Sequence, residues 1–213
     1  MRAEIAVFAR APRPGRTKTR LIPALGPEGA AALYAAFLED TLTKLEGLDA
    51  RLWAASEADA PALEGRGWPV SAQVGGDLGA RMSHAIAEGL GRADAVIVIG
   101  TDAPTLPTAR LRDAIDALRT HGAVLGPSAD GGYYLIGSRA PVSFGAVRWS
   151  TRHALADTLA GLGSPARLLR PWYDVDTPDD LALLRAHLAL RSRDAPATSR
   201  ALSRHFDHSA ADG

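Results

Sequence analysis

The most informative carboxylate in this sequence follows an uninterrupted apolar run. Residues Val96 to Ile99 are four β-branched residues in succession, a pattern typical of a strand that is buried on both faces of a parallel sheet. Gly100 ends the run, and Asp102 follows it. Ligands bind at the carboxyl ends of strands in open α/β sheets, where a metal ion commonly compensates an ionised aspartate. Asp102 is therefore predicted to bind a metal ion; the alternative is that it only caps the next helix.

Basic side chains follow the first predicted strand, which ends at Phe8. The loop that comes next, up to Leu21, holds two prolines, one glycine and five basic residues. The prolines stiffen the loop and the glycine permits an unusual backbone angle, while lysine and arginine bind phosphate oxygens. The alternative is a solvated basic loop, and the spacing is not that of a Walker A loop. The predicted phosphate-binding residues of this loop are Arg10, Gly15, Lys18 and Arg20.

A second glycine-containing turn follows another predicted strand. Gly76 would let the backbone approach a ligand, and Asp77 is a favourable N-cap for a helix that runs to about Gly89. Arg81 would then lie in the first turns of that helix. We predict that Gly76, Asp77 and Arg81 contribute to nucleotide binding; the alternative is that Arg81 only pairs with Asp77.

Three further aspartates are candidates for the same site. Asp130 begins an Asp-Gly-Gly turn, which is typical of a hairpin, and it is a candidate catalytic base. Asp174 and Asp176 precede Thr177, a predicted helix N-cap that Asp180 completes to a capping box. Either of them could be a second metal ligand, and the positive end of the helix dipole favours Asp176.

These residues require a scaffold of alternating strands and helices. Apolar patterns predict strands at residues 5–8, 51–55, 70–74, 96–99, 123–125, 133–136 and 166–169, and helices at 27–45, 77–89, 106–120, 152–162 and from 177. This alternation predicts an α/β fold, a three-layer α/β/α sandwich with a mostly parallel central sheet. Residues 1–190 are expected to form one domain, and residues 191–213 a mobile C-terminal tail because they lack clear periodicity.

The composition limits the possible classes of function. The chain has 213 residues, of which 46% are hydrophobic, and 24 basic residues balance 24 acidic ones. This balance gives no reason to expect nucleic acid or a membrane surface as a partner. There is no cysteine, which excludes disulfides and thiolate chemistry. No signal peptide or stretch approaching a membrane span is evident, so we expect a cytoplasmic protein. The dinucleotide fingerprint GxGxxG and the hydrolase elbow GxSxG are also missing.

Six segments together resemble the motifs of one known family. In chain order they are F-A-R-A-P-R-P-G-R-T-K-T-R-L, G-G-D-L-G-A-R-M, G-T-D-A-P-T-L, P-S-A-D-G-G-Y-Y-L-I-G, W-S-T and D-V-D-T-P-D-D-L. They extend from about Ile5 to Leu184 and are similar to the bacterial glycosyltransferase family formerly called domain of unknown function 2064, whose members are associated with radical-SAM and arsenosugar pathways. That family resembles the GT-A nucleotide-diphospho-sugar transferase superfamily, and the basic loop is similar to a segment of 2-phospholactate guanylyltransferases.

The resemblance implies roles for individual residues. Lys18 and Arg20 would hold phosphates, Asp102 would bind the metal ion, and Asp176 would be the second metal carboxylate. Oxygen ligands without histidine or cysteine suit Mg²⁺ or Mn²⁺.

Three functions are compatible with this set of residues. The first is glycosyl transfer from a nucleotide-diphospho-sugar to a small acceptor, with Asp130 as a base and with Lys18 and Arg81 neutralising the diphosphate. The second is nucleotidyl transfer, which joins a nucleoside triphosphate to a phosphorylated small molecule and releases pyrophosphate. The third is a non-catalytic nucleotide sensor, which could tolerate the loss of a metal carboxylate. The presence of both Asp102 and Asp176 favours an enzyme.

Overall fold

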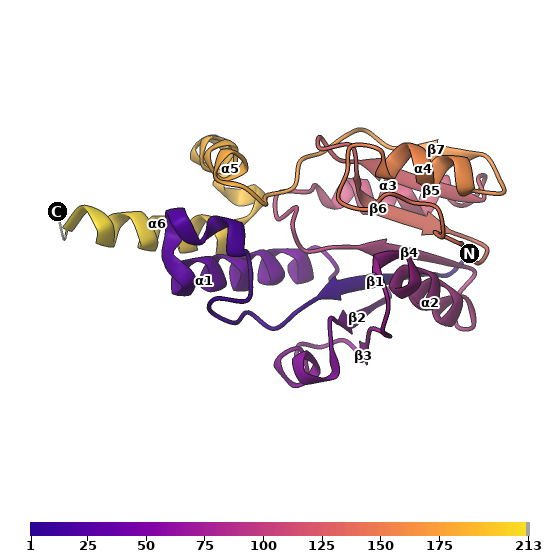
Figure 1. Cartoon of the computed structure of the whole chain (residues 1–213), viewed down its shortest axis with the longest axis horizontal. Coiled ribbons are helices and arrows are strands. Elements are labelled where there is room, and N and C mark those ends of the chain that lie inside the picture. The colour runs from indigo at the N-terminus through magenta and orange to yellow at the C-terminus, as the bar shows by residue number, and fades with distance from the viewer. Residues whose placement is uncertain (212–213) are drawn as a thin grey trace.

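Seven strands form a single sheet in the order β3-β2-β1-β4-β6-β5-β7 (Figure 1). The computed structural model describes residues 1–211. The strands are β1 (Ala3–Ala9), β2 (Ala50–Ala54), β3 (Val70–Ala72), β4 (Ala95–Ile99), β5 (Ala123–Pro127), β6 (Tyr133–Ser138) and β7 (Ala166–Leu168). Neighbouring strands are parallel, except that β6 is antiparallel to both β4 and β5. The predicted mostly parallel sheet is confirmed.

The central strand β4 has all five of its residues buried, as its apolar run predicted. It pairs with β1 on one side and with β6 on the other. The chain leaves β1 towards β2 and returns to β4 on the opposite side of β1, so the strand order reverses between β1 and β4. The crevice at such a reversal is where open α/β sheets bind ligands.

Helices cover both faces of the sheet. They are α1 (Ile22–Thr43), α2 (Leu78–Leu90), α3 (Thr108–Ala117), α4 (Ala154–Gly161), α5 (Pro178–Arg191) and α6 (Pro196–Ala211), with short 3-10 helices η1 (Thr19–Leu21), η2 (Glu57–Ala62) and η3 (Ser192–Asp194). On one face Leu38 of α1 and Leu111 of α3 pack against the strands. On the other face Met82 of α2 and Leu155 of α4 do so. The result is the predicted three-layer sandwich.

Helix α1 is the longest described helix and is largely apolar. The stretch Thr19–Thr43 is long and apolar enough to cross a membrane by length and composition, although half of its most apolar window is buried inside the protein. Leu33 and Phe37 contact Leu184 and Leu188 of α5 in a third apolar cluster. The packing explains the composition of α1, because a core helix surrounded by apolar neighbours needs few polar residues.

The structure differs from the predicted mobile tail after residue 190. Helix α6 packs along α1, and Ala197 and Leu202 are buried there. The buried carboxylate of Asp40 on α1 accepts hydrogen bonds from the backbone N–H groups of Ala197 (2.9 Å) and Thr198 (2.8 Å). It therefore caps the start of α6 from a distant part of the chain, which no local periodicity reveals. The final part of the predicted tail, residues 212–213, lies outside the described residues.

Candidate active site

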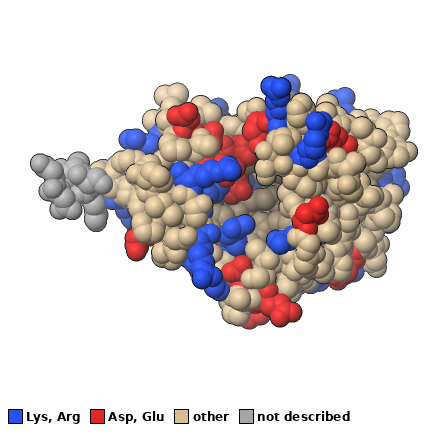
Figure 2. Space-filling view, in the orientation of Figure 1, with Lys and Arg blue, Asp and Glu red and all other residues tan. Residues whose placement is uncertain are grey.

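A cleft of about 690 Å³ opens along the edge of the sheet where β1 and β4 end. Figure 2 shows this side of the molecule, with basic and acidic side chains around a hollow. The antiparallel strand β6 begins at the same edge, because Leu135 pairs with Ile99 at the end of β4. Residues from the basic loop, from α2 and from the turn before β6 line the cleft. The sheet thus brings together segments that are far apart in the sequence.

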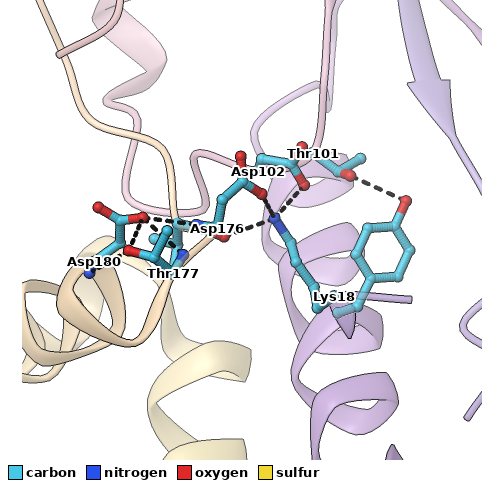
Figure 3. Close-up of polar contacts among 8 residues, drawn as sticks. Lys18, Thr101, Asp102, Asp176, Thr177 and Asp180 are labelled. Carbon is cyan, nitrogen blue, oxygen red and sulfur yellow. Dashed lines mark hydrogen bonds and ion pairs between the residues drawn. The ribbon is translucent and has the colours of Figure 1, made fainter. Parts of the chain in front are cut away.

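Lys18 lies at the centre of the polar contacts in this cleft (Figure 3). Its Nζ is 2.7 Å from Oδ1 of Asp102 and 2.7 Å from Oδ1 of Asp176, and it donates a hydrogen bond to the carbonyl of Val175 at 2.6 Å. Burial of the lysine disfavours its charged form, but the two carboxylates outweigh burial and raise the pKa of Lys18. Three residues that the sequence proposed for one site therefore meet at a single atom.

The backbone of Lys18 is held in an unusual conformation. Its φ of 47° is left-handed, which is uncommon for a residue other than glycine and is found where the surrounding structure imposes it. The carbonyl of Lys18 accepts a hydrogen bond from the backbone N–H of Leu21 in η1. Nζ of Lys18 lies over the ring of Phe37, 5.5 Å from the ring centroid. Only 5% of the side chain is exposed, so the loop delivers the ammonium group to a fixed position.

Tyr34 connects the basic loop with the end of β4. This buried residue of α1 accepts a hydrogen bond from the backbone N–H of Arg10 (3.0 Å) and another from the hydroxyl of Thr101 (3.1 Å). Thr101 immediately precedes Asp102. The phosphate-binding candidates and the metal candidate are therefore positioned by the same core side chain, a connection that the sequence alone did not indicate.

The segment that carries Asp176 is fixed by the start of α5. Asp180 and Thr177 form the predicted capping box, and Asp180 also accepts a hydrogen bond from the backbone of Asp176 at 3.0 Å. The backbone N–H of Val175 bonds to the carbonyl of Asp102 at 2.8 Å. Both carboxylates that contact Lys18 are therefore held by neighbouring backbone bonds.

Asp174 also lines the cleft. The described ion pairs of Lys18 are with Asp102 and Asp176, not with Asp174. Burial raises the pKa of Asp174 to about 6, and the negative charges of Asp130, Asp176 and Asp102 act in the same direction. Four carboxylates thus share one region in which Lys18 is the central cation. The excess of negative charge there suits a divalent cation.

The donor set supports a hard metal ion, with a limited number of protein ligands. Asp102 and Asp176 direct one oxygen each at the same cationic group, and 45% and 42% of these side chains remain exposed. Among the described residues no group of three or more histidine, cysteine, aspartate or glutamate side chains is arranged to hold a metal. Mg²⁺ is commonly bound by one or two carboxylates together with substrate phosphates and water, and this arrangement fits that pattern.

Asp130 lies in the cleft at the turn between β5 and β6. Its Oδ1 accepts hydrogen bonds from the hydroxyl of Ser128 and from the backbone N–H of Gly132. These bonds stabilise the turn and also fix the orientation of the carboxylate. Asp130 therefore has a structural role in this turn. It is also exposed, as a catalytic base must be.

The remaining predicted nucleotide-binding residues separate into two groups. Arg10, Lys18, Arg20 and Arg81 line the cleft, whereas Gly15, Gly76 and Asp77 do not contribute to its lining. Gly15 and Gly76 instead adopt positive φ angles of 73° and 107° and shape their turns. Asp77 caps α2 by accepting a hydrogen bond from Ala80 at 2.8 Å, and the guanidinium of Arg81 donates to the carbonyl of Gly76 at 3.1 Å.

The cleft also contains residues that the sequence analysis did not select. Arg16 belongs to the same basic loop and could have been included on composition alone. Tyr133 and Trp149 also line the cleft, but aromatic residues after glycine-rich turns resemble ordinary core residues. Ser150, next to Trp149, has a φ of 58°, which only the structure reveals.

Comparisons with known proteins agree with the fold. The family model described as "Uncharacterized protein conserved in bacteria (DUF2064)" matches residues 38–151. No curated protein matches the sequence. Among solved structures, a proposed nucleotide-diphospho-sugar transferase from Desulfovibrio desulfuricans G20 is 32% identical, with a TM-score of 0.87, and the match covers 97% of this chain and 96% of that one.

More distant structures share the fold. Rv0371C from Mycobacterium tuberculosis H37Rv, crystallised in complex with manganese, is 24% identical with a TM-score of 0.54, and the match covers 86% of this chain and 98% of that one. The 2-C-methyl-D-erythritol 4-phosphate cytidylyltransferase from Thermus thermophilus is 16% identical with a TM-score of 0.53, over 89% of this chain and all of that one (100%). Together with the first match, they confirm the predicted nucleotide-diphospho-sugar transferase fold.

Proposed function

The chain belongs to the bacterial family DUF2064, and we propose that it is a metal-dependent transferase that uses a nucleotide-activated donor. The reaction we favour is glycosyl transfer from a nucleotide-diphospho-sugar to a small acceptor. The observation that supports this most strongly is the convergence of Lys18, Asp102 and Asp176 at the reversal point of the sheet. Similarity to a solved protein described as a nucleotide-diphospho-sugar transferase supports the use of a nucleotide-activated donor. A cytoplasmic location is part of this proposal, as the sequence analysis expected.

The basic side of the cleft is the proposed diphosphate site. Arg10, Arg16, Lys18 and Arg20 come from one loop, and Arg81 faces the cleft from α2. Arginine and lysine neutralise phosphate charge and donate hydrogen bonds to its oxygens. The ends of β2 and β3 continue the cleft beyond this loop through Ala55 and Gln73, and we assign the nucleoside to that part.

Asp102 and Asp176 are the proposed ligands of Mg²⁺ or Mn²⁺. Such an ion would supply positive charge to the diphosphate as it leaves. Lys18 holds the two carboxylates together at 2.7 Å each and, with the arginines of the loop, stabilises the same developing charge. The residues that bind the donor thus also favour departure of its leaving group.

The proposed transfer forms one bond and breaks one. A hydroxyl oxygen of the acceptor bonds to the anomeric carbon of the donor sugar, the bond from that carbon to the diphosphate oxygen breaks, and its electron pair leaves with the nucleoside diphosphate. Asp130 accepts the hydroxyl proton. The hydrogen bonds from Ser128 and Gly132 to Oδ1 orient this carboxylate, as a base must be oriented for efficient proton transfer.

Nucleotidyl transfer is a second candidate, and the basic loop is the observation that favours it. Four cations in one loop could hold the β- and γ-phosphates of a nucleoside triphosphate while a phosphorylated molecule attacks the α-phosphate. In that reaction the group that leaves is pyrophosphate, not a nucleoside diphosphate. The two candidates are therefore distinguished by the product that leaves.

Phosphorus NMR of reaction mixtures provides the test. The wild-type protein is incubated with Mg²⁺, a donor and a mixture of small alcohols, sugars and sugar phosphates. One set of donors consists of UDP-glucose, GDP-mannose and other sugars activated with CDP, UDP or GDP. The other set consists of the four nucleoside triphosphates. Glycosyl transfer predicts that the wild type releases a nucleoside diphosphate from a nucleotide sugar and that Asp102→Asn does not. Release of pyrophosphate from a triphosphate, equally dependent on Asp102, would support the second candidate. Turnover that does not depend on Asp102 would contradict both.

A further inference from the structure

Basic and acidic side chains of the cleft come from different segments. Among the described residues that line it, every lysine and arginine comes from the basic loop or from α2, while Asp102, Asp130, Asp174 and Asp176 follow β4, β5 and β7. The part of the cleft that holds these aspartates is called the acidic side, and Lys18 lies at its border, in contact with Asp102 and Asp176. Figure 2 shows both signs of charge at the rim of the hollow. A diphosphate held by the basic loop, and by a metal ion at Asp102 and Asp176, leaves the part of the acidic side beside Asp130 for the other part of the reaction.

Tyr133 and Trp149 form an aromatic wall of the cleft beside the turn of Asp130. Their rings meet at an interplanar angle of 68°, with centroids 6.4 Å apart, and both residues line the cleft. The polar atoms of both rings are directed into the protein. The hydroxyl of Tyr133 accepts a hydrogen bond from the buried Thr158 at 3.3 Å, and Nε1 of Trp149 is fully buried, with no partner among the described residues. The ring surface that this wall offers to the cleft is therefore carbon.

The contact with α2 explains why the indole N–H faces away from the cleft. A Cβ atom at Gly79 would lie 3.3 Å from Nε1 of Trp149 and 2.7 Å from Cβ of Phe144. Trp149 thus packs its nitrogen edge on the first turn of α2, and only a glycine leaves enough space. The opposite part of the ring remains for the cleft.

The segment that carries Trp149 is fixed at both ends. Arg148 makes three hydrogen bonds to the carboxylate of Asp157 on α4. On the other side, the backbone of Arg152 would lie 2.4 Å from a Cβ atom at Gly131, so the segment sits directly against the turn of Asp130. Ser150 between them is held at a φ of 58°. This strained backbone indicates a position imposed by its surroundings.

We propose that the acidic side of the cleft binds an uncharged, hydroxylated ring, whose carbon face packs on Tyr133 and Trp149 and whose hydroxyl groups face the aspartates. This inference rests on the proposed function and specifies the ligand that accompanies the diphosphate. Carbon surface beside carboxylates suits C–H groups on one face and hydroxyl donors on the other. A phosphate placed here would face Asp130 and Asp174, which are not the partners of Lys18 in the described structure, and like charges disfavour such binding.

Two parts of a glycosyl transfer have this chemistry, namely the sugar of the donor and the acceptor. They are separated by calorimetric titration of wild-type and Trp149→Ala protein in the presence of Mg²⁺. The donor probes are UDP-glucose with UDP as its reference, and GDP-mannose with GDP as its reference. The acceptor probes are methyl α-D-glucopyranoside and glucose 1-phosphate, each added to protein that is already saturated with UDP or GDP. If Trp149→Ala binds a nucleotide sugar about two- to tenfold more weakly than the wild type does, and binds the nucleoside diphosphate with unchanged affinity, the wall is assigned to the donor sugar. Weakening of the methyl glucoside alone would assign it to the acceptor.

Two further variants separate recognition from folding. Trp149→Phe keeps a carbon surface and should retain most of the affinity, whereas Trp68→Ala removes a tryptophan that does not line the cleft and should leave every affinity unchanged. The melting temperature of each variant shows whether the fold is intact.

The inference is overturned if no sugar-containing probe depends on Trp149, or if glucose 1-phosphate binds the acidic side more tightly than the methyl glucoside does. The proposed function has a separate point of failure, because it requires the nucleoside diphosphates themselves to bind. Nucleotide binding without any dependence on Trp149 would reject the inference and leave the proposed function standing.

Discussion

Lys18 shows how one residue can organise a polar site. Its left-handed backbone and its 5% exposed side chain place the ammonium between Asp102 and Asp176. Without that charge, the two aspartates would stand close together with repulsion between them and with Asp174 nearby. Lys18 thus stabilises the carboxylate pair in the protein alone and, in the proposed reaction, the charge of the leaving diphosphate.

Substitution of the two neighbouring aspartates should have unequal effects. Asp176→Asn removes a proposed metal ligand and should reduce the transfer rate by about a hundredfold or more, which corresponds to several kcal/mol of transition-state stabilisation. Asp174→Asn should cost less, roughly tenfold, since Asp174 acts through its neighbours. Steady-state rates of both variants check this order. A larger loss in Asp174→Asn would transfer the role of metal ligand to that residue.

Lys44 provides a test of stability against pH. Burial lowers the pKa of Lys44 to about 8, although Asp40 and Asp194 act in the opposite direction, and Nζ donates a hydrogen bond to the carbonyl of Pro104. Between pH 8 and about 10 the unfolded chain therefore binds more protons at this residue than the folded protein does. This contribution favours folding increasingly as the pH rises.

The difference in the free energy of unfolding between the wild type and Lys44→Met isolates the contribution of Lys44. From pH 7 to pH 9 the free energy of unfolding of the wild type should increase, relative to that of the variant, by on the order of 1 kcal/mol. Urea denaturation at each pH measures it. A constant difference across this range would show that Lys44 is not desolvated in the folded protein.

At the scale of secondary-structure elements, local patterns predicted most of the fold. The apolar run of β4, the capping box of α5 and the N-cap Asp77 of α2 were evident because each depends on adjacent residues. Helix α6 was missed because its start is bound by Asp40, 157 residues earlier in the chain. The contact between Lys18 and Asp176 spans a similar separation of 158 residues, and it was anticipated only through the position of both residues after strands and through the family resemblance.

The element that was missed leads to a prediction about α6. Asp40→Ala leaves the buried N–H groups of Ala197 and Thr198 without their acceptor, so the free energy of unfolding should fall by about 1–3 kcal/mol. The neighbouring substitution Glu39→Ala is the control, because it removes only an exposed ion pair with Arg200 and should change stability by less than about 1 kcal/mol. Thermal melts compare the two. Equal melting temperatures would mean that α6 contributes little to the stability of the domain.

At the scale of the whole molecule, the sheet collects charged residues of both signs at one edge. The reversal between β1 and β4 places the basic loop beside Asp102, and the antiparallel strand β6 adds the Asp130 turn to the same edge. The aromatic residues Tyr133 and Trp149 complete the acidic side. Sequence analysis identified the charges at strand ends but not this wall, because Tyr133 belongs to β6 and Trp149 to the segment before α4, and their rings meet only in the folded chain.

The central claim is that this edge binds a nucleotide together with a divalent cation held by Asp102. The most direct measurement is calorimetric titration of UDP and GDP into wild-type and Asp102→Asn protein, with and without Mg²⁺. The predicted result is that Mg²⁺ increases the affinity of the wild type for at least one nucleotide by roughly tenfold or more, as expected when a first metal carboxylate contributes to binding, and that Asp102→Asn loses this increase. Equal affinities of the two proteins, unaffected by Mg²⁺, would contradict the account.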